Sequence, residues 1–157
     1  GGTHWSDPAK VGRFNWDFAG CPHVGGGLIA RGSSLHALVW TGAAGVSGAY
    51  HLNSTYHGQS WSAPQRLGDA DARRGDLAST GGESLAAVWD RVSDGESNVF
   101  AATSRDGGKT WGEAKQLSAK AINAAYPRVV AVNGSYRVFW TESVTGQPGV
   151  WKMASLP

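Results

Sequence analysis

The sequence predicts an all-β fold of repeated units, each made of four antiparallel strands. An eight-residue segment at 104–111 (SRDGGKTW) recurs in a less complete form at 54–61 (STYHGQSW), about 50 residues earlier. A second series of tryptophans, Trp40, Trp89 and Trp140, recurs at nearly the same period. The 157 residues also include 23 glycines and 8 tryptophans, with no long apolar run, which is typical of a turn-rich chain with little helix.

The period identifies the repeating unit. Four strands of about 5 to 6 residues and their turns fill one period, so one repeat is expected to be one blade of a β-propeller. The strands expected in the middle repeat are 74–80, 84–91, 98–104 and 110–117. The preceding and following repeats give 24–31, 34–41, 49–54, 60–67, 126–132, 136–142 and 150–155. The corresponding blades are 24–68, 74–118 and 126–157, with 119–125 as a linker.

The two ends of the chain match parts of the same repeat. Residues 1–11 match 107–117, so we expect them to form the outer strand of a blade, while 126–157 supplies three strands of another. The pieces amount to about three blades, and a propeller closes with about four to eight. The chain is therefore half of a longer, six-bladed propeller, or two copies associate head to tail. The glycine pair at residues 1 and 2 favours the first arrangement.

The recurring eight-residue segment has the composition of a tight turn between two strands. Asp106 is expected to accept backbone N–H groups two or three residues ahead, and the following glycines permit positive φ. The tryptophan at its end is expected to pack into the blade. We therefore assign a structural role to the residues of both copies: Ser104, Asp106, Gly108, Thr110, Trp111, Ser54, Gly58, Ser60 and Trp61.

These segments resemble the Asp-box, or BNR repeat, of sialidase-like β-propellers, and the resemblance extends over nearly the whole chain. It implies an extracytoplasmic location and a box on the rim away from the substrate pocket. It also implies a tyrosine nucleophile with an acidic partner, an aspartate acid/base and three arginines that grip the substrate carboxylate. The family's Phe/Tyr-Arg-Ile-Pro signature is absent here, as expected of a second half.

Inner strands line the axial channel of a propeller, so residues at their starts are the ligand-binding candidates. This selects Arg74 and Asp76 in the middle blade, and Tyr126 and Arg128 in the last. By the resemblance, Arg128 is a candidate clamp arginine, and Tyr126 or Glu142 a candidate for the nucleophile pair. The alternative for each is an ordinary strand end or a cross-strand ion pair. No complete catalytic set is present.

Trp16 is a separate candidate. It lies in a segment without a counterpart in the other repeats, so we expect it either to contact a ligand or partner, or to pack under its own loop.

Composition argues against several other functions. The net charge is +2, and the 14 basic residues are dispersed, unlike a nucleic-acid-binding face. No segment is apolar enough for membrane insertion. The single cysteine, Cys21, excludes an internal disulfide and is expected to be a small buried thiol. The five histidines lack metal-ligand spacing, so neither a metal nor another cofactor is expected.

The leading functional hypothesis is therefore a non-catalytic binding or scaffold module for a glycan or a protein partner. The alternative is the C-terminal half of an exo-sialidase-like glycoside hydrolase. The remaining blades, on a longer chain or a second copy, are the expected structural partners.

Overall fold

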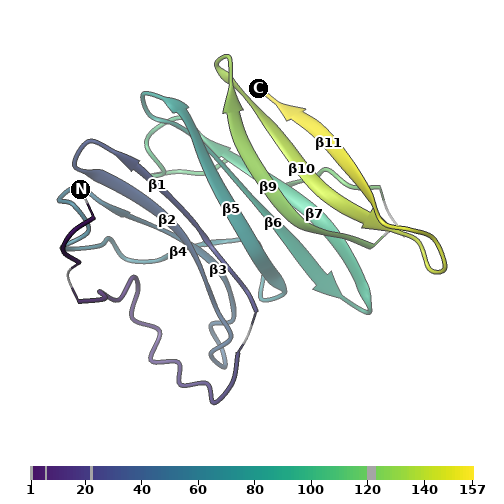
Figure 1. The fold of residues 1–157 in the computed structure, drawn as a ribbon, viewed down its shortest axis with the longest axis horizontal. Helices are drawn as coiled ribbons and strands as arrows, with labels where there is room; N and C mark the ends of the chain where they lie inside the picture. Colours follow the sequence, from purple (N-terminus) through teal and green to yellow (C-terminus); the bar gives the residue numbers. More distant parts are fainter. Residues whose placement is uncertain (1, 6, 22, 120–122) are drawn as a thin grey trace.

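The computed structural model describes residues 2–5, 7–21, 23–119 and 123–157. Within these residues the chain forms three antiparallel sheets and no helix (Figure 1). The first sheet contains β1 Gly27–Arg31, β2 Ser34–Thr41, β3 Gly48–Ser54 and β4 Gln65–Leu67. The second contains β5 Ala72–Gly81, β6 Ser84–Ser93, β7 Glu96–Ser104 and β8 Lys115–Gln116. The third contains β9 Asn123–Val132, β10 Ser135–Ser143 and β11 Val150–Leu156. The expected all-β fold class with propeller-type blades is confirmed.

Within each sheet, consecutive strands are neighbours, as the repeat predicts. The main departure is at the outer strands, since β4 and β8 are short. Residues 110–114 remain in the turn, where the Gly112 amide donates to the Thr103 carbonyl at 2.9 Å, before pairing begins at Lys115. The expected linker 119–125 is also shorter, because β9 begins at Asn123; residues 120–122 lie outside the described residues.

The middle sheet is covered on both faces. One face packs against the first sheet through a cluster that includes Leu38, Leu77 and Trp89. The other packs against the third sheet through a cluster that includes Val88 and Trp140. Alternate residues of a strand point to opposite faces, so the six consecutive residues 85–90 of β6 are buried, unlike a strand with one face in water.

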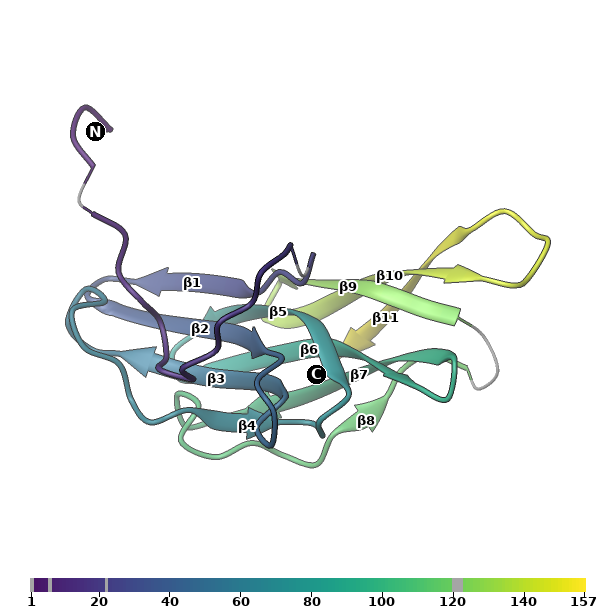
Figure 2. The same cartoon turned by 90° about the horizontal axis from the view of Figure 1, so that it is seen from below.

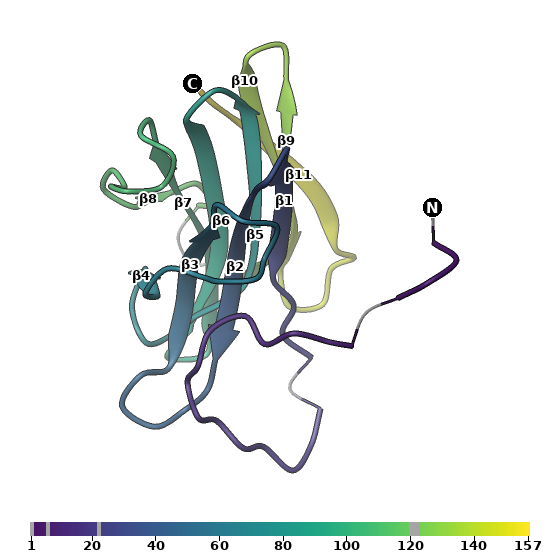
Figure 3. The same ribbon diagram turned by 90° about the vertical axis from the view of Figure 1, so that its left-hand side faces the viewer.

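The N-terminal residues run beside the first sheet, at the opposite end of the molecule from β11 (Figures 1 and 2). Residues 2–5 and 7–11 form no strand here, and Trp5 is 88% exposed. An outer strand over 1–11 stays a prediction. Cys21 is exposed, so the expected buried thiol was wrong: the chain around it lies outside the sheets (Figure 3).

The turn after β7 is held by side-chain hydrogen bonds. Ser104 Oγ accepts from the amides of Gly108, at 2.9 Å, and Asp106, at 3.3 Å. Asp106 accepts from the amide of Thr110 at 2.9 Å and from its hydroxyl at 2.5 Å, so its main partner lies four residues ahead, further than expected. The Gly107 amide then donates to the Glu83 carbonyl, which joins this turn to the β5–β6 turn.

The turn after β3 repeats this arrangement without the carboxylate. Ser54 Oγ accepts from the amides of Gly58 and Tyr56, at 2.9 and 3.2 Å, and the His57 amide donates to the Ser33 carbonyl. Tyr56 occupies the aspartate position and is 59% exposed. The serine therefore fixes both turns, while the aspartate adds bonds to one of them.

The first tryptophan of the second series holds a different place from the other two. Leu35 opposes Ser54 as Leu85 opposes Ser104, which gives Val39 the register position of Trp89. Trp40 is then equivalent to Asp90. The register of the first repeat is therefore shifted by one residue relative to the middle repeat. Aligning the repeats on their tryptophans does not reveal this shift.

Replacing Asp106 by alanine should lower the melting temperature above pH about 4. The bonds from Thr110, and then from Ser104, lower the pKa of Asp106 from 3.8 to about 2. Because the folded pKa lies below the unfolded one, this stabilisation is present above the unfolded pKa and is lost as the pH falls toward about 2. Thermal melts of both proteins from neutral to acid pH should converge there; equal melts at pH 7 would contradict the role of Asp106.

Tyr56→Asp should raise the melting temperature. The new carboxylate would face the amide and hydroxyl of Ser60, the counterpart of Thr110, and so supply the bonds that this turn lacks. Tyr56→Ala is the matched control, since it removes the ring without adding a carboxylate. A Tyr56→Asp protein that melts no higher than the alanine control would show that the first turn cannot use the aspartate.

Candidate functional site

The inner strands β5 and β9 each begin with a bulge at the same place in the repeat. The register slips between Arg73 and Asp76 in β5, and between Ala125 and Arg128 in β9. Arg74 and Tyr126 lie in these bulges with φ of 28° and 58°, a region that residues other than glycine rarely adopt. Bulges redirect side chains and are frequent next to active sites. Two strained residues at equivalent positions therefore mark the inner-strand starts as a candidate site.

The neighbours of the two bulged residues explain the local fold. Gly75 follows Arg74, and a Cβ there would lie 2.4 Å from Leu38 of the first sheet. Pro127 follows Tyr126 and has no N–H to contribute to a strand ladder, so it suits a bulge. Close packing at one position and the missing donor at the other thus favour the same backbone irregularity.

The side chains of Arg74 and Tyr126 meet across the two sheets. The Arg74 guanidinium carbon lies 4.3 Å from the centre of the Tyr126 ring, which is a cation–π contact. Tyr126 is 58% exposed, while Arg74 is partly buried. The sequence placed both residues among the candidates, and the structure brings them together.

The carboxylate of Asp90 bonds to both residues of this pair. Its carboxylate on β6 lies 2.8 Å from Arg74 Nε and accepts the Tyr126 amide at 3.0 Å. The Asp90 side chain is fully buried. Burial raises the pKa of Asp90, whereas the Tyr126 amide and the Arg74 guanidinium act in the opposite direction by stabilising the carboxylate. One buried group thus fixes an arginine of one sheet and the backbone of the next.

Sequence reasoning missed Asp90, although a signal was present. It follows directly after the apolar run 85–89, where a charged residue is rarely buried without a partner. The other two repeats have Thr41 and Thr141 after their tryptophans. A carboxylate in place of a threonine, one strand away from Arg74, is the pattern that could have identified it.

The other predicted candidates have separate surroundings. Asp76 accepts the Val129 amide at 3.0 Å and so links the second and third sheets. Arg128 is exposed and donates to the Pro127 carbonyl. Glu142 is 7% exposed and accepts Trp140 Nε1 at 2.9 Å. Among the described residues, no hydrogen bond joins Tyr126 to Glu142, so the structure does not assemble them as a pair.

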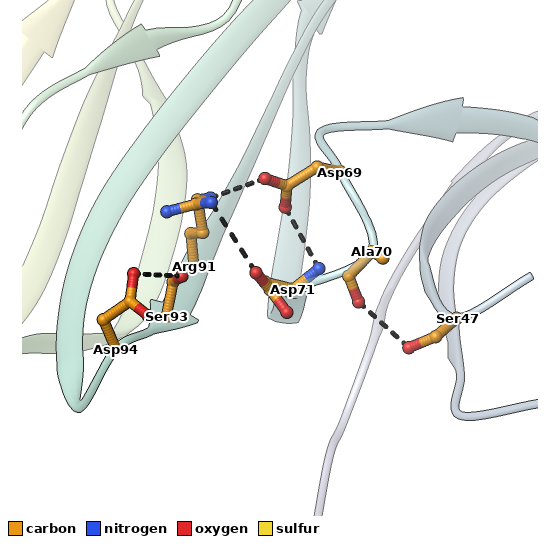
Figure 4. A network of polar contacts seen from close by, with 7 residues as sticks. All are labelled: Ser47, Asp69, Ala70, Asp71, Arg91, Ser93 and Asp94. Atoms are coloured by element: carbon orange, nitrogen blue, oxygen red, sulfur yellow. Dashed lines mark hydrogen bonds and ion pairs between the residues drawn. The ribbon is translucent and has the colours of Figure 1, made fainter. Parts of the chain in front are cut away.

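The loop before β5 is held by a surface network (Figure 4). Arg91 Nε lies 2.5 Å from Asp69, and its Nη2 lies 3.6 Å from Asp71. The Asp69 carboxylate also accepts the Asp71 amide at 3.0 Å, and Ser47 donates to the Ala70 carbonyl. These exposed ion pairs contribute little to stability, but they fix the chain that leads to Arg74.

Trp16 packs on its own chain. Its ring meets Trp40 edge-on at 5.1 Å and stacks on Phe18 at 5.2 Å. It lines a groove of about 1210 Å³ between the N-terminal segment and the first sheet, together with Leu52 and Trp61. The observed contacts match the packing alternative, while ligand contact stays a prediction.

A second hollow lies at the turn end of the first and second sheets. It encloses about 630 Å³ and is lined by His36 and Lys109, among others. His36 Nδ1 lies 3.2 Å from Nε2 of the buried His51. Burial, followed by the neighbouring His36, lowers the pKa of His51 to about 4. Burial, followed by the charge of Arg31, also lowers the pKa of His36. Neither this hollow nor the groove includes Arg74 or Tyr126, which lie on an open surface.

No protein-family model matches the sequence. No curated protein matches it either. Solved structures do share its fold. The NanB sialidase from Streptococcus pneumoniae superposes with a TM-score of 0.55 at 19% identity, over 80% of this chain and 20% of that one. The catalytic domain of the Coprinopsis cinerea GH62 α-L-arabinofuranosidase gives 0.52 at 11% identity, over 82% and 52%. The Podospora anserina α-L-arabinofuranosidase PaAbf62A gives 0.54 at 9% identity, over 83% and 52%.

These similarities show the fold alone, because every identity is below a fifth. The chain spans between a fifth and about half of the length of these proteins. Among the described residues, no helix is long and apolar enough to cross a membrane.

Asp90→Ala should lower the free energy of unfolding by about 3 kcal/mol, because it leaves the Arg74 charge and the Tyr126 amide without their buried partner. Asp71→Ala is the control: it removes an exposed partner of Arg91 and should cost less than about 1 kcal/mol. Urea unfolding measures both. Equal losses would show that Asp90 does not join the sheets as described.

Proposed function

We propose that this chain is a non-catalytic glycan-binding part of a sialidase-like, Asp-box propeller, with its binding surface at the starts of the inner strands. The observation that carries the proposal is the Arg74 guanidinium stacked on the exposed Tyr126 ring and fixed by buried Asp90. A preorganised arginine beside an exposed aromatic ring offers a charged donor and an apolar face, the two contacts that a sugar with an acidic group needs.

The charge around the pair favours an anionic ligand. Asp90 is paired with Arg74, so these two charges offset each other, while Asp76 accepts the Val129 amide and keeps its negative charge. Arg73 and Arg128 are exposed at the same strand ends, and neither forms a salt bridge within the described residues. The net charge at these strand ends is therefore positive, which favours a carboxylate-bearing sugar over a neutral one.

The bonding of the acidic groups supports a binding role over catalysis. A tyrosine nucleophile needs a nearby base to activate it, and Glu142 is buried and bonded to Trp140. The second candidate function is the C-terminal half of an exo-sialidase-like hydrolase. It is favoured by the exposed Tyr126 in a strained bulge. An extracytoplasmic location is part of the proposal and rests on the resemblance of the turns to Asp-boxes.

A titration with a sialylated trisaccharide and with its neutral disaccharide core tests the proposal. Calorimetry should show tighter binding of the sialylated sugar. Tyr126→Ala removes the apolar face of the site and should weaken that binding about tenfold, which corresponds to about 1.4 kcal/mol. Val130→Ala, an exposed residue further along β9, is the control and should leave binding unchanged.

Two results would contradict the proposal. Equal affinity of wild type and Tyr126→Ala would show that the binding surface does not lie at the inner-strand starts. Release of sialic acid from a fluorogenic substrate by wild type, abolished in Tyr126→Phe, would establish the hydrolase instead.

A further inference from the structure

The face of the first sheet that packs on the second sheet carries two neighbouring histidines. His36 on β2 lies two residues before Leu38, which opposes His51 on β3, so both rings lie on the same face. His36 Nδ1 is 3.2 Å from His51 Nε2, and the two rings are stacked with their centres 5.4 Å apart. We call His36 and His51 the histidine pair.

The histidine pair is buried in the contact between the two sheets. His51 is 2% exposed and His36 is 9% exposed. A Cβ added at Gly108, in the turn after β7, would lie 2.3 Å from His51 Cε1, so the ring packs directly on this glycine. The Trp111 ring, which follows the same turn, meets His51 edge-on at 5.2 Å. His51 therefore cannot move away from His36 unless the turn after β7 also moves.

The equivalent contact, between the second and third sheets, has no histidine at these positions. The strand register makes Ala86 equivalent to His36, and Ala101 equivalent to His51. Both alanines are buried in the cluster that joins the second and third sheets. Apolar side chains are thus sufficient for one contact, whereas the other contains two titratable rings. Sheet packing alone does not account for the histidines.

The hydrogen bond between the rings limits how many protons the pair can carry. A neutral imidazole carries a proton on one of its two nitrogens and a charged one on both. The bond needs one proton between His36 Nδ1 and His51 Nε2, and one further proton can still go to an outer nitrogen. If both rings were charged, two N–H groups would face each other at 3.2 Å and two positive charges would be buried together. Two charged rings must therefore separate.

The charged groups around the pair do not offset a positive charge. Arg31 and Lys109 line the same hollow as His36, and so do Glu83 and Asp106, so their four charges sum to zero. The Asp106 carboxylate is already bonded within its own turn. Among the described residues, the one side-chain hydrogen bond of either ring is the bond to the other ring, so no carboxylate compensates a proton added to the pair.

Acid therefore weakens this contact. Burial, followed by the neighbouring His36, lowers the pKa of His51 from 6.5 to about 4. Because the folded pKa lies below the unfolded one, the stabilisation is fully present above pH about 6.5 and is lost as the pH falls toward about 4. This range includes pH 5 to 6, where protonation of histidine clusters changes interfaces in pH-sensing proteins.

We propose that the histidine pair is an acid-sensitive joint between the first and second sheets. The neutral pair holds the turn after β7 against β3. Protonation releases this turn and opens the hollow of about 630 Å³ beside it. Both sheets have four described strands, so the joint does not depend on either end of the chain. Arg74 and Tyr126 do not line the hollow, so the inference is independent of the proposed glycan binding.

Urea unfolding at pH 7 and at pH 5 tests the joint. The unfolding equilibrium constant of wild type should rise about twentyfold between these two pH values, because the pKa of His51 changes from about 4 to 6.5 on unfolding. His51→Gln removes the titrating ring and should lose most of this rise. His57→Gln is the matched control, because His57 is an exposed histidine of the same sheet's turn, and it should keep the rise.

A nuclear magnetic resonance titration of wild type provides a measurement that does not depend on a variant folding. The ring protons of His51 should titrate at a lower pH than those of His57. The Gly108 amide and the Trp111 indole N–H should shift together with the His51 ring, since both groups lie against it.

Three results would overturn the joint. The first is a His51 ring that titrates near pH 6.5 in the folded protein. The second is a His51→Gln protein with the full pH dependence of wild type. The third is a pair that titrates while the signals of Gly108 and Trp111 stay unchanged, because the turn after β7 would then not respond to the added proton.

Discussion

A sheet in this fold is stabilised only where another sheet covers its faces. The middle sheet meets this condition on both sides, and its strand β6 is buried from residue 85 to residue 90. The first and third sheets meet it on one side each. This constraint explains why small residues such as Ala86 and Ala87 occupy the middle sheet, between its two neighbours.

The same packing forms the candidate site. Asp90 is buried because the third sheet covers β6, and burial leaves its carboxylate with the two donors nearest to it, Arg74 and the Tyr126 amide. A charge removed from water must be paired. The residue that makes the contact between the sheets stable is therefore also the residue that orients the arginine. Stability and the proposed binding are coupled through one side chain.

Much of the fold was predictable from the sequence, because a repeat of four strands constrains period, strand length and order together. The bounds of β2 agree with expectation at both ends, whereas β5 and β9 begin at Ala72 and Asn123, before the expected starts at 74 and 126. The bulges were not predictable, since one extra residue leaves little trace in a strand pattern. Trp40 shows the same limit: its residue type matches the repeat, but its register does not.

Asp90 was missed for a different reason. Its importance depends on two contacts from different sheets, and neither sheet position is visible in the local sequence. The repeat comparison, with threonine directly after the tryptophan in both other repeats, was the available signal. The hydrogen bonds of the turns were easier to predict, because Ser104 and Asp106 bond to groups within their own segment.

Buried Asp90 holds the start of the third sheet against the second. The most direct measurement is hydrogen exchange at the Tyr126 amide, since the Tyr126 side chain is exposed while its N–H is bonded to Asp90. We predict exchange of this amide as slow as that of the β6 amides, and much faster exchange in Asp90→Ala. Exchange in the wild type as fast as in the exposed loop 144–149 would contradict it.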